Sequence, residues 1–290
     1  MADAIVSDNQ GGIVAMNTAR AHVLAREGSN IHYWTTGPER GPLVVLTHGA
    51  TLDHHMFAAQ VGPLAAAGYR VLTWDMRGHG LSKPMGARFT LEIVTDDLLA
   101  IVDRVGGDAA TFVGHSFGGF VSQEVVRRHP ERVRALGVIA CTDLSRKPAA
   151  GMRVAYRLLP HILPLMSVST FRRRTIQDLS TRAEVRRYGY DATGRLSKDE
   201  FIAVIMAGVA CLADASGHSA GHTIPRPFLL THGDQDTANR GVFAKHAQAW
   251  AEKEPNCTYR VVPGAGHTAN QDNPEAFNEM LLEFLDRTSA

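Results

Sequence analysis

Cysteine and net charge are both scarce in this sequence of 290 residues. The three cysteines, Cys141, Cys211 and Cys257, lie far apart and outside any metal-ligand spacing, so they predict reduced, mostly buried thiols instead of a metal site. The formal net charge is +1. A chain this close to neutral gives no reason to expect nucleic acid as a partner.

Long apolar segments and targeting signals are missing as well. The longest apolar run, residues 201–213, has thirteen residues, whereas a helix that crosses a bilayer needs about twenty. Residues 1–20 lack the basic start and the continuous apolar core of a secretory signal, so we expect a loosely ordered tail there. We therefore expect a cytoplasmic protein with no membrane partner.

Two local patterns alternate along most of the chain. Hydrophobic residues make up 44% and charged residues 20% of it, which is typical of a globular protein. Short apolar runs alternate with segments of helical spacing, and this order predicts an α/β fold with a mostly parallel, doubly covered sheet. Strands are expected at residues 21–26, 30–36, 43–46, 70–74, 109–113, 133–140, 228–231 and 258–262, and helices at 54–67, 91–105, 120–128, 241–252 and 274–286.

Residues 145–223 break this alternation. They hold helical patterns at 151–159, 169–181 and 201–212, and twelve Arg or Lys residues against six Asp or Glu residues. We predict a helical insertion whose arginine clusters, at 172–174 and 186–187, form a solvated face; attraction of an anionic substrate is the alternative. The apolar residues 204–209 either line a substrate pocket or pack the insertion onto the body.

The segment Gly114-His115-Ser116-Phe117-Gly118 lies between an expected strand and an expected helix. A serine in such a G-x-S-x-G turn has a strained backbone that exposes its hydroxyl, and the small flanking residues permit the crowded turn. The pattern predicts Ser116 as a nucleophile at a nucleophile elbow. The alternative is an ordinary glycine-rich turn between a strand and a helix.

An acid and an imidazole follow two later strands. Asp236 comes after the strand expected at 228–231, and His267 comes after the strand expected at 258–262. A serine hydroxyl needs a base to take its proton, and a carboxylate behind the imidazole fixes the tautomer of that base. We therefore predict a catalytic triad of Ser116, Asp236 and His267, with Asp143 and Asp234 as alternative acids.

The negative charge that develops on an attacked carbonyl needs backbone donors. The N–H groups of Ala50, in the loop after the third expected strand, and of Phe117, after the nucleophile, are placed to form this oxyanion hole. His48, in the same loop, is predicted to be structural, and His115 is the variable residue of the elbow.

The run Asp53-His54-His55 is the one local hint of a metal site. Because adjacent histidines on a helix are expected to point in different directions, and because no further ligand is evident, we predict no metal ion here. No cofactor is expected.

Together these motifs make the chain resemble the α/β-hydrolase fold family with a helical cap. The resemblance extends from about residue 21 to residue 287. The resemblance implies a tail at 1–20, a core at 21–144 and 224–290, and a cap at 145–223. The matching motifs are His48-Gly49, Asp75-x-Arg77-Gly78-His79-Gly80-x-Ser82, the elbow with Gly119, Gly233-x-x-Asp236 and Gly266-His267.

The resemblance implies a serine hydrolase that cleaves a small to medium carboxylic ester or lactone through an acyl-enzyme on Ser116. A serine nucleophile argues against epoxide hydrolase and haloalkane dehalogenase chemistry, which relatives perform with an aspartate. Carbon–carbon bond hydrolases of this family often have a glycine-rich oxyanion loop, which Ala50-Thr51-Leu52 lacks. A carbon–carbon bond hydrolase remains an alternative. So do a cofactor-independent oxygenase, a perhydrolase and a small-molecule receptor with the same triad.

Overall fold

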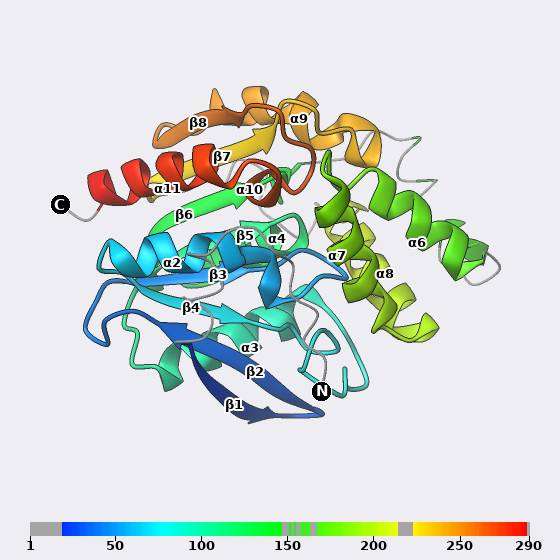
Figure 1. Ribbon diagram of the computed structural model, residues 1–290, viewed down its shortest axis with the longest axis horizontal. Helices are drawn as coiled ribbons and strands as arrows, with labels where there is room; N and C mark the ends of the chain where they lie inside the picture. The colour runs from blue at the N-terminus through cyan, green and yellow to red at the C-terminus, as the bar shows by residue number, and fades with distance from the viewer. Residues whose placement is uncertain are drawn as a thin grey trace.

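The computed structural model describes residues 19–146, 167–213 and 223–288, together with a few single positions between 151 and 162. One sheet of eight strands runs through the molecule (Figure 1). Its strands are β1 (Arg20–Arg26), β2 (Ser29–Thr36), β3 (Leu43–Thr47), β4 (Arg70–Trp74), β5 (Ala110–His115), β6 (Val133–Ile139), β7 (Phe228–Gly233) and β8 (Cys257–Val262). They are arranged in the order β1-β2-β4-β3-β5-β6-β7-β8.

The sheet is mostly parallel, as the alternation of strands and helices predicted. β2 is antiparallel to both β1 and β4, and all the other neighbouring strands are parallel. Every residue of β3 and β5 is buried, which explains why these strands are apolar runs without alternation: helices cover both of their faces. β1 lies at an edge, and its residues are exposed or half-buried.

Helices cover the two faces of the sheet in two separate layers (Figure 1). The helices of the described residues are η1 (His54–Phe57), α2 (Ala58–Ala66), α3 (Leu91–Arg104), α4 (Phe117–Arg128), η2 (Pro130–Arg132), α6 (Val168–Gln177), α7 (Ala183–Gly194), α8 (Lys198–Ala213), α9 (Ala238–Ala251), α10 (Ala269–Asp272) and α11 (Pro274–Thr288). Apolar residues of α3, α4 and α9 pack on one face, and those of α2 and α11 pack on the other.

The single helix expected at 54–67 is divided in two. A short 3-10 turn, η1, comes first and α2 follows it. The side chain of Asp53 accepts a hydrogen bond from the N–H of His55 and so caps the 3-10 turn. This local bond competes with the regular helix that the apolar spacing predicts.

The helices α6, α7 and α8, which we call the cap helices, lie between β6 and β7 in the chain. Figure 1 shows them grouped on the side of the molecule toward which β7 points. Val204 and Ala207 of α8 are buried in the same cluster as Phe117, so the apolar run 204–209 does pack the insertion onto the body. The expected ranges 169–181 and 201–212 match α6 and α8, whereas α7 was not among them.

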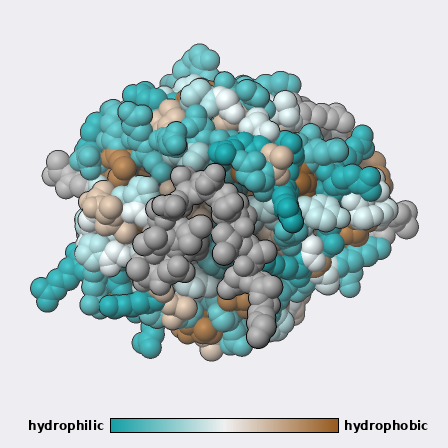
Figure 2. Space-filling model, in the orientation of Figure 1, coloured by the Kyte–Doolittle hydropathy of each residue, from teal (hydrophilic) through white to brown (hydrophobic). Residues whose placement is uncertain are grey.

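Two expectations fall largely or wholly outside the described residues. The loosely ordered tail at 1–20 has only its last two residues in the described part, and most of the helix pattern at 151–159 is not described. Within the described ranges, none of the helices has the length and apolar character needed to cross a membrane. The face drawn in Figure 2 is mostly hydrophilic, with apolar residues in separate spots.

A buried ion pair joins α3 to the loop after β4. Arg77 Nε lies 2.7 Å from Asp97 Oδ2, and Arg77 Nη2 lies 2.9 Å from Asp97 Oδ1. Both side chains are buried, and Arg26 of β1 binds the same carboxylate at 3.1 Å. This pair fixes the loop that carries the Asp75-x-Arg77-Gly78-His79-Gly80 motif.

Removing the carboxylate of this pair should destabilise the protein strongly. Asp97→Ala leaves the buried Arg77 guanidinium without its main partner, and a broken buried pair typically costs about 3 to 5 kcal/mol. Asp103→Ala is the matched control, because it removes the exposed partner of Arg132 from the same helix and should cost less than about 1 kcal/mol. Urea unfolding of the two variants measures the difference; equal midpoints would contradict a structural role for the buried pair.

Candidate active site

Ser116 lies between β5 and α4 in a conformation that is rare for a residue with a side chain. Its φ is 50° and its ψ is −114°, and its N–H donates to the Ile139 carbonyl at 2.9 Å. A Cβ atom at Gly118 would overlap the carbonyl oxygens of Thr47 and His48, so the second glycine of the motif is required by close packing. The turn has the strained geometry that the sequence predicted for a nucleophile elbow.

The structure brings the predicted acid and the predicted base together. Asp236 Oδ2 lies 3.1 Å from His267 Nδ1, and both side chains are buried. The other oxygen of Asp236 accepts the N–H of Ala238 at 2.9 Å. The carboxylate therefore holds His267 with a proton on Nδ1, which leaves Nε2 free to accept a proton.

The two alternative acids have different partners. Asp143 accepts the backbone N–H and the hydroxyl of Ser145, a turn bond two residues along the chain. Asp234 is exposed and accepts the N–H of Ala265 at 3.1 Å. Of the three candidates, Asp236 is the one whose carboxylate bonds the His267 imidazole.

His115, the variable residue of the elbow motif, contacts the predicted base directly. Its Nε2 donates to the His267 carbonyl at 3.0 Å, and the two rings meet edge-on with centroids 4.7 Å apart. Phe243 packs on the His267 ring at a centroid distance of 4.9 Å. Burial and the neighbouring His267 hold the pKa of His115 well below its ordinary value, so it acts as a neutral donor. No motif signals this role, because the position between Gly114 and Ser116 accepts many residues.

The loop after β3, residues 48–53, carries Ala50 and is called the oxyanion loop below. His48 Nε2 accepts the N–H of Met76 at 3.0 Å, and His48 Nδ1 donates to the Gly49 carbonyl at 2.8 Å. Gly49 packs so closely on the His115 ring that a Cβ atom would overlap it. The loop thus lies directly against the elbow, and the contacts of His48 are structural, as its place in this loop predicts.

A second buried histidine, His79, is hydrogen-bonded to the oxyanion loop. His79 Nε2 accepts the N–H of Thr51 at 3.1 Å, while His79 Nδ1 donates to the Arg77 carbonyl. Both bonds require the neutral ring with its proton on Nδ1. Burial, with the neighbouring His48, lowers the pKa of His79 to about 3, and burial also lowers the pKa of His48.

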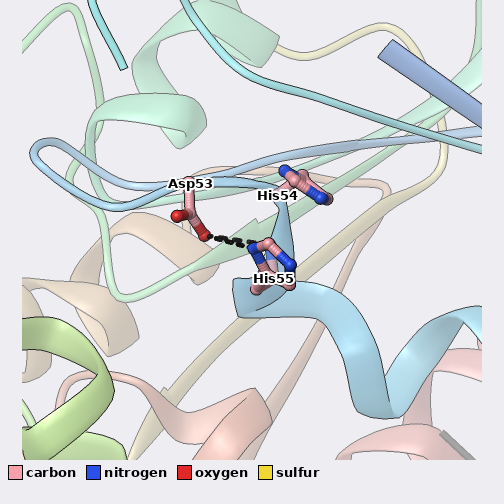
Figure 3. Close-up of side chains that lie close together, drawn as sticks. All are labelled: Asp53, His54 and His55. Carbon is pink, nitrogen blue, oxygen red and sulfur yellow. Dashed lines mark hydrogen bonds and ion pairs between the residues drawn. The ribbon is translucent and has the colours of Figure 1, made fainter. Parts of the chain in front are cut away.

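Asp53, His54 and His55 lie close together at the start of η1 (Figure 3). Their potential ligand atoms are within 4.8 Å of one another, and the two imidazole rings are 3.9 Å apart. The expectation that the adjacent histidines diverge is therefore wrong, because the tight 3-10 turn brings the two rings against each other at an interplanar angle of 36°. Each Nδ1 is bonded to a carboxylate, His54 to Asp75 and His55 to Asp53.

The charges around this cluster do not favour a cation. Arg195 Nη1 lies 3.1 Å from Asp53 Oδ2, so a guanidinium already neutralises the carboxylate that a metal ion would need. The prediction of no metal ion here consequently rests on the partners of Asp53 and no longer on the directions of the histidine rings.

The turn between α6 and α7 is tied to the loop that carries His267. The N–H of Thr268 donates to the Leu179 carbonyl at 2.9 Å. The buried carboxylate of Asp272 accepts the N–H of Gly266 at 2.7 Å, the N–H of Thr181 at 3.1 Å and the Ser180 hydroxyl. The cap helices therefore contact the site on its histidine side through charge-assisted bonds.

The neutral state of His79 predicts a pH-dependent stability. Because its pKa is about 3 in the folded protein and near 6.5 in the unfolded chain, the unfolded state binds more protons as the pH falls below about 6.5. Between pH 7 and pH 5 this residue should reduce the free energy of unfolding by about 2 kcal/mol. Denaturant unfolding of wild type and His79→Gln at both pH values tests this, and the variant should lose less stability on acidification. An equal loss in the two proteins would contradict a neutral His79.

The chain matches the model of the alpha/beta hydrolase family over residues 44–280. It is 28% identical over 265 residues to the dihydrolipoyllysine-residue acetyltransferase component of the acetoin cleaving system of Pseudomonas putida, covering 89% of this chain and 67% of that protein. It is 26% identical over 293 residues to the AB hydrolase superfamily protein YfhM of Bacillus subtilis, covering 93% and 99%. A thermophilic esterase from Thermogutta terrifontis has a TM-score of 0.79 at 22% identity, covering 94% of this chain and 100% of that one.

The names of further relatives describe different reactions. A bifunctional epoxide hydrolase of Sus scrofa, of which this chain covers 23%, a non-heme chloroperoxidase of Streptomyces lividans and a 2-hydroxymuconate semialdehyde hydrolase of Pseudomonas putida also match. Likeness to these proteins thus does not select a substrate. The family model spans most of the chain and agrees with the eight-stranded sheet, and we conclude that the chain belongs to the alpha/beta hydrolase family.

Proposed function

We propose that the protein is a serine hydrolase that cleaves a small to medium carboxylic ester or lactone. The observation that carries the proposal is the buried hydrogen bond of 3.1 Å between Asp236 and His267. It orients an imidazole whose neighbour His115 directly precedes Ser116. Asp236 is the acid in this proposal, in preference to Asp143 and Asp234, because its carboxylate makes that bond.

Each residue has a separate role in the proposed reaction. Nε2 of His267 takes the proton of the Ser116 hydroxyl while Oγ forms a bond to the ester carbon. The tetrahedral intermediate collapses, the bond to the leaving oxygen breaks, and His267 returns the proton to that oxygen. A water molecule then attacks the acyl-enzyme with the same base, which releases the acid and restores Ser116. Asp236 stabilises the imidazolium form in both halves.

The backbone donors of the proposed oxyanion hole are the N–H groups of Ala50 and Phe117. The close packing of Gly118 on the oxyanion loop supports this assignment, because it holds the two donors near each other. Such preorganised donors stabilise charge as it develops, and loss of one typically costs about 3 kcal/mol of transition-state stabilisation.

The surroundings of the elbow support an ester with an apolar acyl group. The Phe117 ring packs against Phe89 at a centroid distance of 5.4 Å, and Gly208 of α8 approaches the same ring. We infer that residues 145–223 form a cap over this apolar side. The excess of arginine in the cap keeps an anionic ester within the proposed class.

The first test is the release of nitrophenol from acetate, butyrate and octanoate esters. Wild type should turn over at least one of them, and Ser116→Ala should reduce kcat by about a thousandfold or more, since the nucleophile is lost. Ser169→Ala, at an exposed serine of α6, is the control and should match wild type. Turnover that survives in Ser116→Ala, or a folded wild type without any turnover, would overturn the proposal and direct attention to oxygen consumption and ligand binding.

A second test separates the three acids. Asp236→Asn should lower kcat about a thousandfold or more while the protein stays folded, because an amide favours the wrong imidazole tautomer. Asp143→Asn and Asp234→Asn are matched controls and should keep kcat within about threefold of wild type, since their partners are Ser145 and Ala265. Circular dichroism verifies the fold of each variant. Greater damage from Asp143→Asn would assign the acid to that residue instead.

A further inference from the structure

We infer that the cap helix α7 positions the oxyanion loop, and that the Tyr188 hydroxyl is the group through which it does so. The inference rests on the proposed function, because it assigns a role within the same site. It makes Tyr188 a positioning residue: it acts on the backbone near Ala50 and touches no reacting atom.

The Tyr188 hydroxyl contacts three different atoms of Asp53, the last residue of the oxyanion loop. It lies 2.9 Å from the carboxylate oxygen Oδ1 and 3.1 Å from the Asp53 carbonyl oxygen, and it accepts the Asp53 N–H at 3.3 Å. Tyr188 and Asp53 are 135 residues apart in the sequence. One side chain of the cap thus fixes both the backbone and the side chain of a core residue.

The same carboxylate anchors the segment that follows the loop. Asp53 Oδ1 accepts the backbone N–H of His55 at 3.1 Å and so caps η1, while Arg195, just after α7, binds Oδ2 at 3.1 Å. Asp53 is buried, and its charge is compensated by these donors. Two groups of the cap, the Tyr188 hydroxyl and the Arg195 guanidinium, therefore meet the His55 N–H of η1 at one side chain.

A second contact of α7 reaches the residue next to Ala50. The Thr193 hydroxyl lies 3.3 Å from the Thr51 hydroxyl, and both side chains are buried. Thr51 has a φ of 66°, a backbone conformation that costs energy for a residue with a branched side chain. Two contacts maintain this conformation, one from His79 to the Thr51 N–H and one from Thr193 of α7 to the Thr51 hydroxyl.

Ala50 lies between these anchors, in a segment without a regular helix or strand. Gly49 packs on His115 on one side of it, and Thr51 and Asp53 are held on the other. The direction of the Ala50 N–H consequently depends on contacts made by the cap as well as by the core. Burial and the Asp53 carboxylate raise the pKa of Tyr188 well above its ordinary value, so its hydroxyl keeps the proton that it donates.

Tyr188→Phe removes the hydroxyl and keeps the buried ring. Tyr190→Phe is the matched control, because Tyr190 lies on the same helix with 53% of its surface exposed. Thr193→Val removes the second contact in case Tyr188→Phe does not fold. We expect Tyr188→Phe to lower kcat about tenfold to a hundredfold with KM within twofold, Thr193→Val to act in the same direction, and Tyr190→Phe to match wild type.

Two further measurements distinguish positioning from a general loss of structure. A trifluoromethyl ketone adds reversibly to the serine hydroxyl and forms an oxyanion, so its inhibition constant should rise in Tyr188→Phe by the same factor by which kcat/KM falls. Amide hydrogen exchange should be faster in peptides that cover residues 48–55 and unchanged in peptides of β5 and β6.

The outcomes separate this inference from the proposed function. Unchanged kcat, inhibition and loop exchange in Tyr188→Phe would overturn the inference while a Ser116-dependent wild type upholds the proposed function. Faster exchange throughout the protein would overturn it as well, since the hydroxyl would then stabilise the whole fold. If wild type hydrolyses no ester, the proposed function fails, and the exchange measurement alone decides whether Tyr188 holds the loop.

Discussion

The close packing of the elbow against the oxyanion loop is the constraint on which the rest of the site depends. Gly118 contacts the carbonyl groups of Thr47 and His48, and Gly49 contacts the His115 ring. His115 in turn donates to the carbonyl of His267. These contacts connect the turn at Ser116, the oxyanion loop and the loop that carries His267. None of the three segments can shift without disturbing its neighbours.

The cap helices extend this arrangement to both sides of the site. Tyr188 holds the oxyanion loop through Asp53, and the turn between α6 and α7 holds the histidine loop through Asp272. These are charge-assisted bonds with buried carboxylates, which are stronger than bonds between neutral groups. The inserted helices are thus hydrogen-bonded to two loops of the candidate site, the oxyanion loop and the loop that carries His267.

Membership in the alpha/beta hydrolase family explains the sheet and the placement of the site at the carboxyl ends of the strands. It leaves the substrate open, because relatives with this fold carry names of different reactions. A shared fold does not select a reaction, so the choice of substrate depends on the side chains around the candidate site. The aromatic contact of Phe117 with Phe89 and the excess of arginine in residues 145–223 are therefore the features that bear on the choice of substrate.

The sequence by itself determined the strands, most of the helices and the positions of Ser116 and His267, because local apolar spacing and short motifs encode them. Only the tertiary structure brought Asp236 to His267 and gave Asp143 and Asp234 other partners. It also decided the contacts of His115 and Tyr188, and the close approach of the His54 and His55 rings. The physical reason is that most of these contacts join segments that lie apart in the sequence, by 31 residues for Asp236 and His267 and by 135 for Tyr188 and Asp53. Such contacts follow from how the layers pack, and no local pattern records that packing.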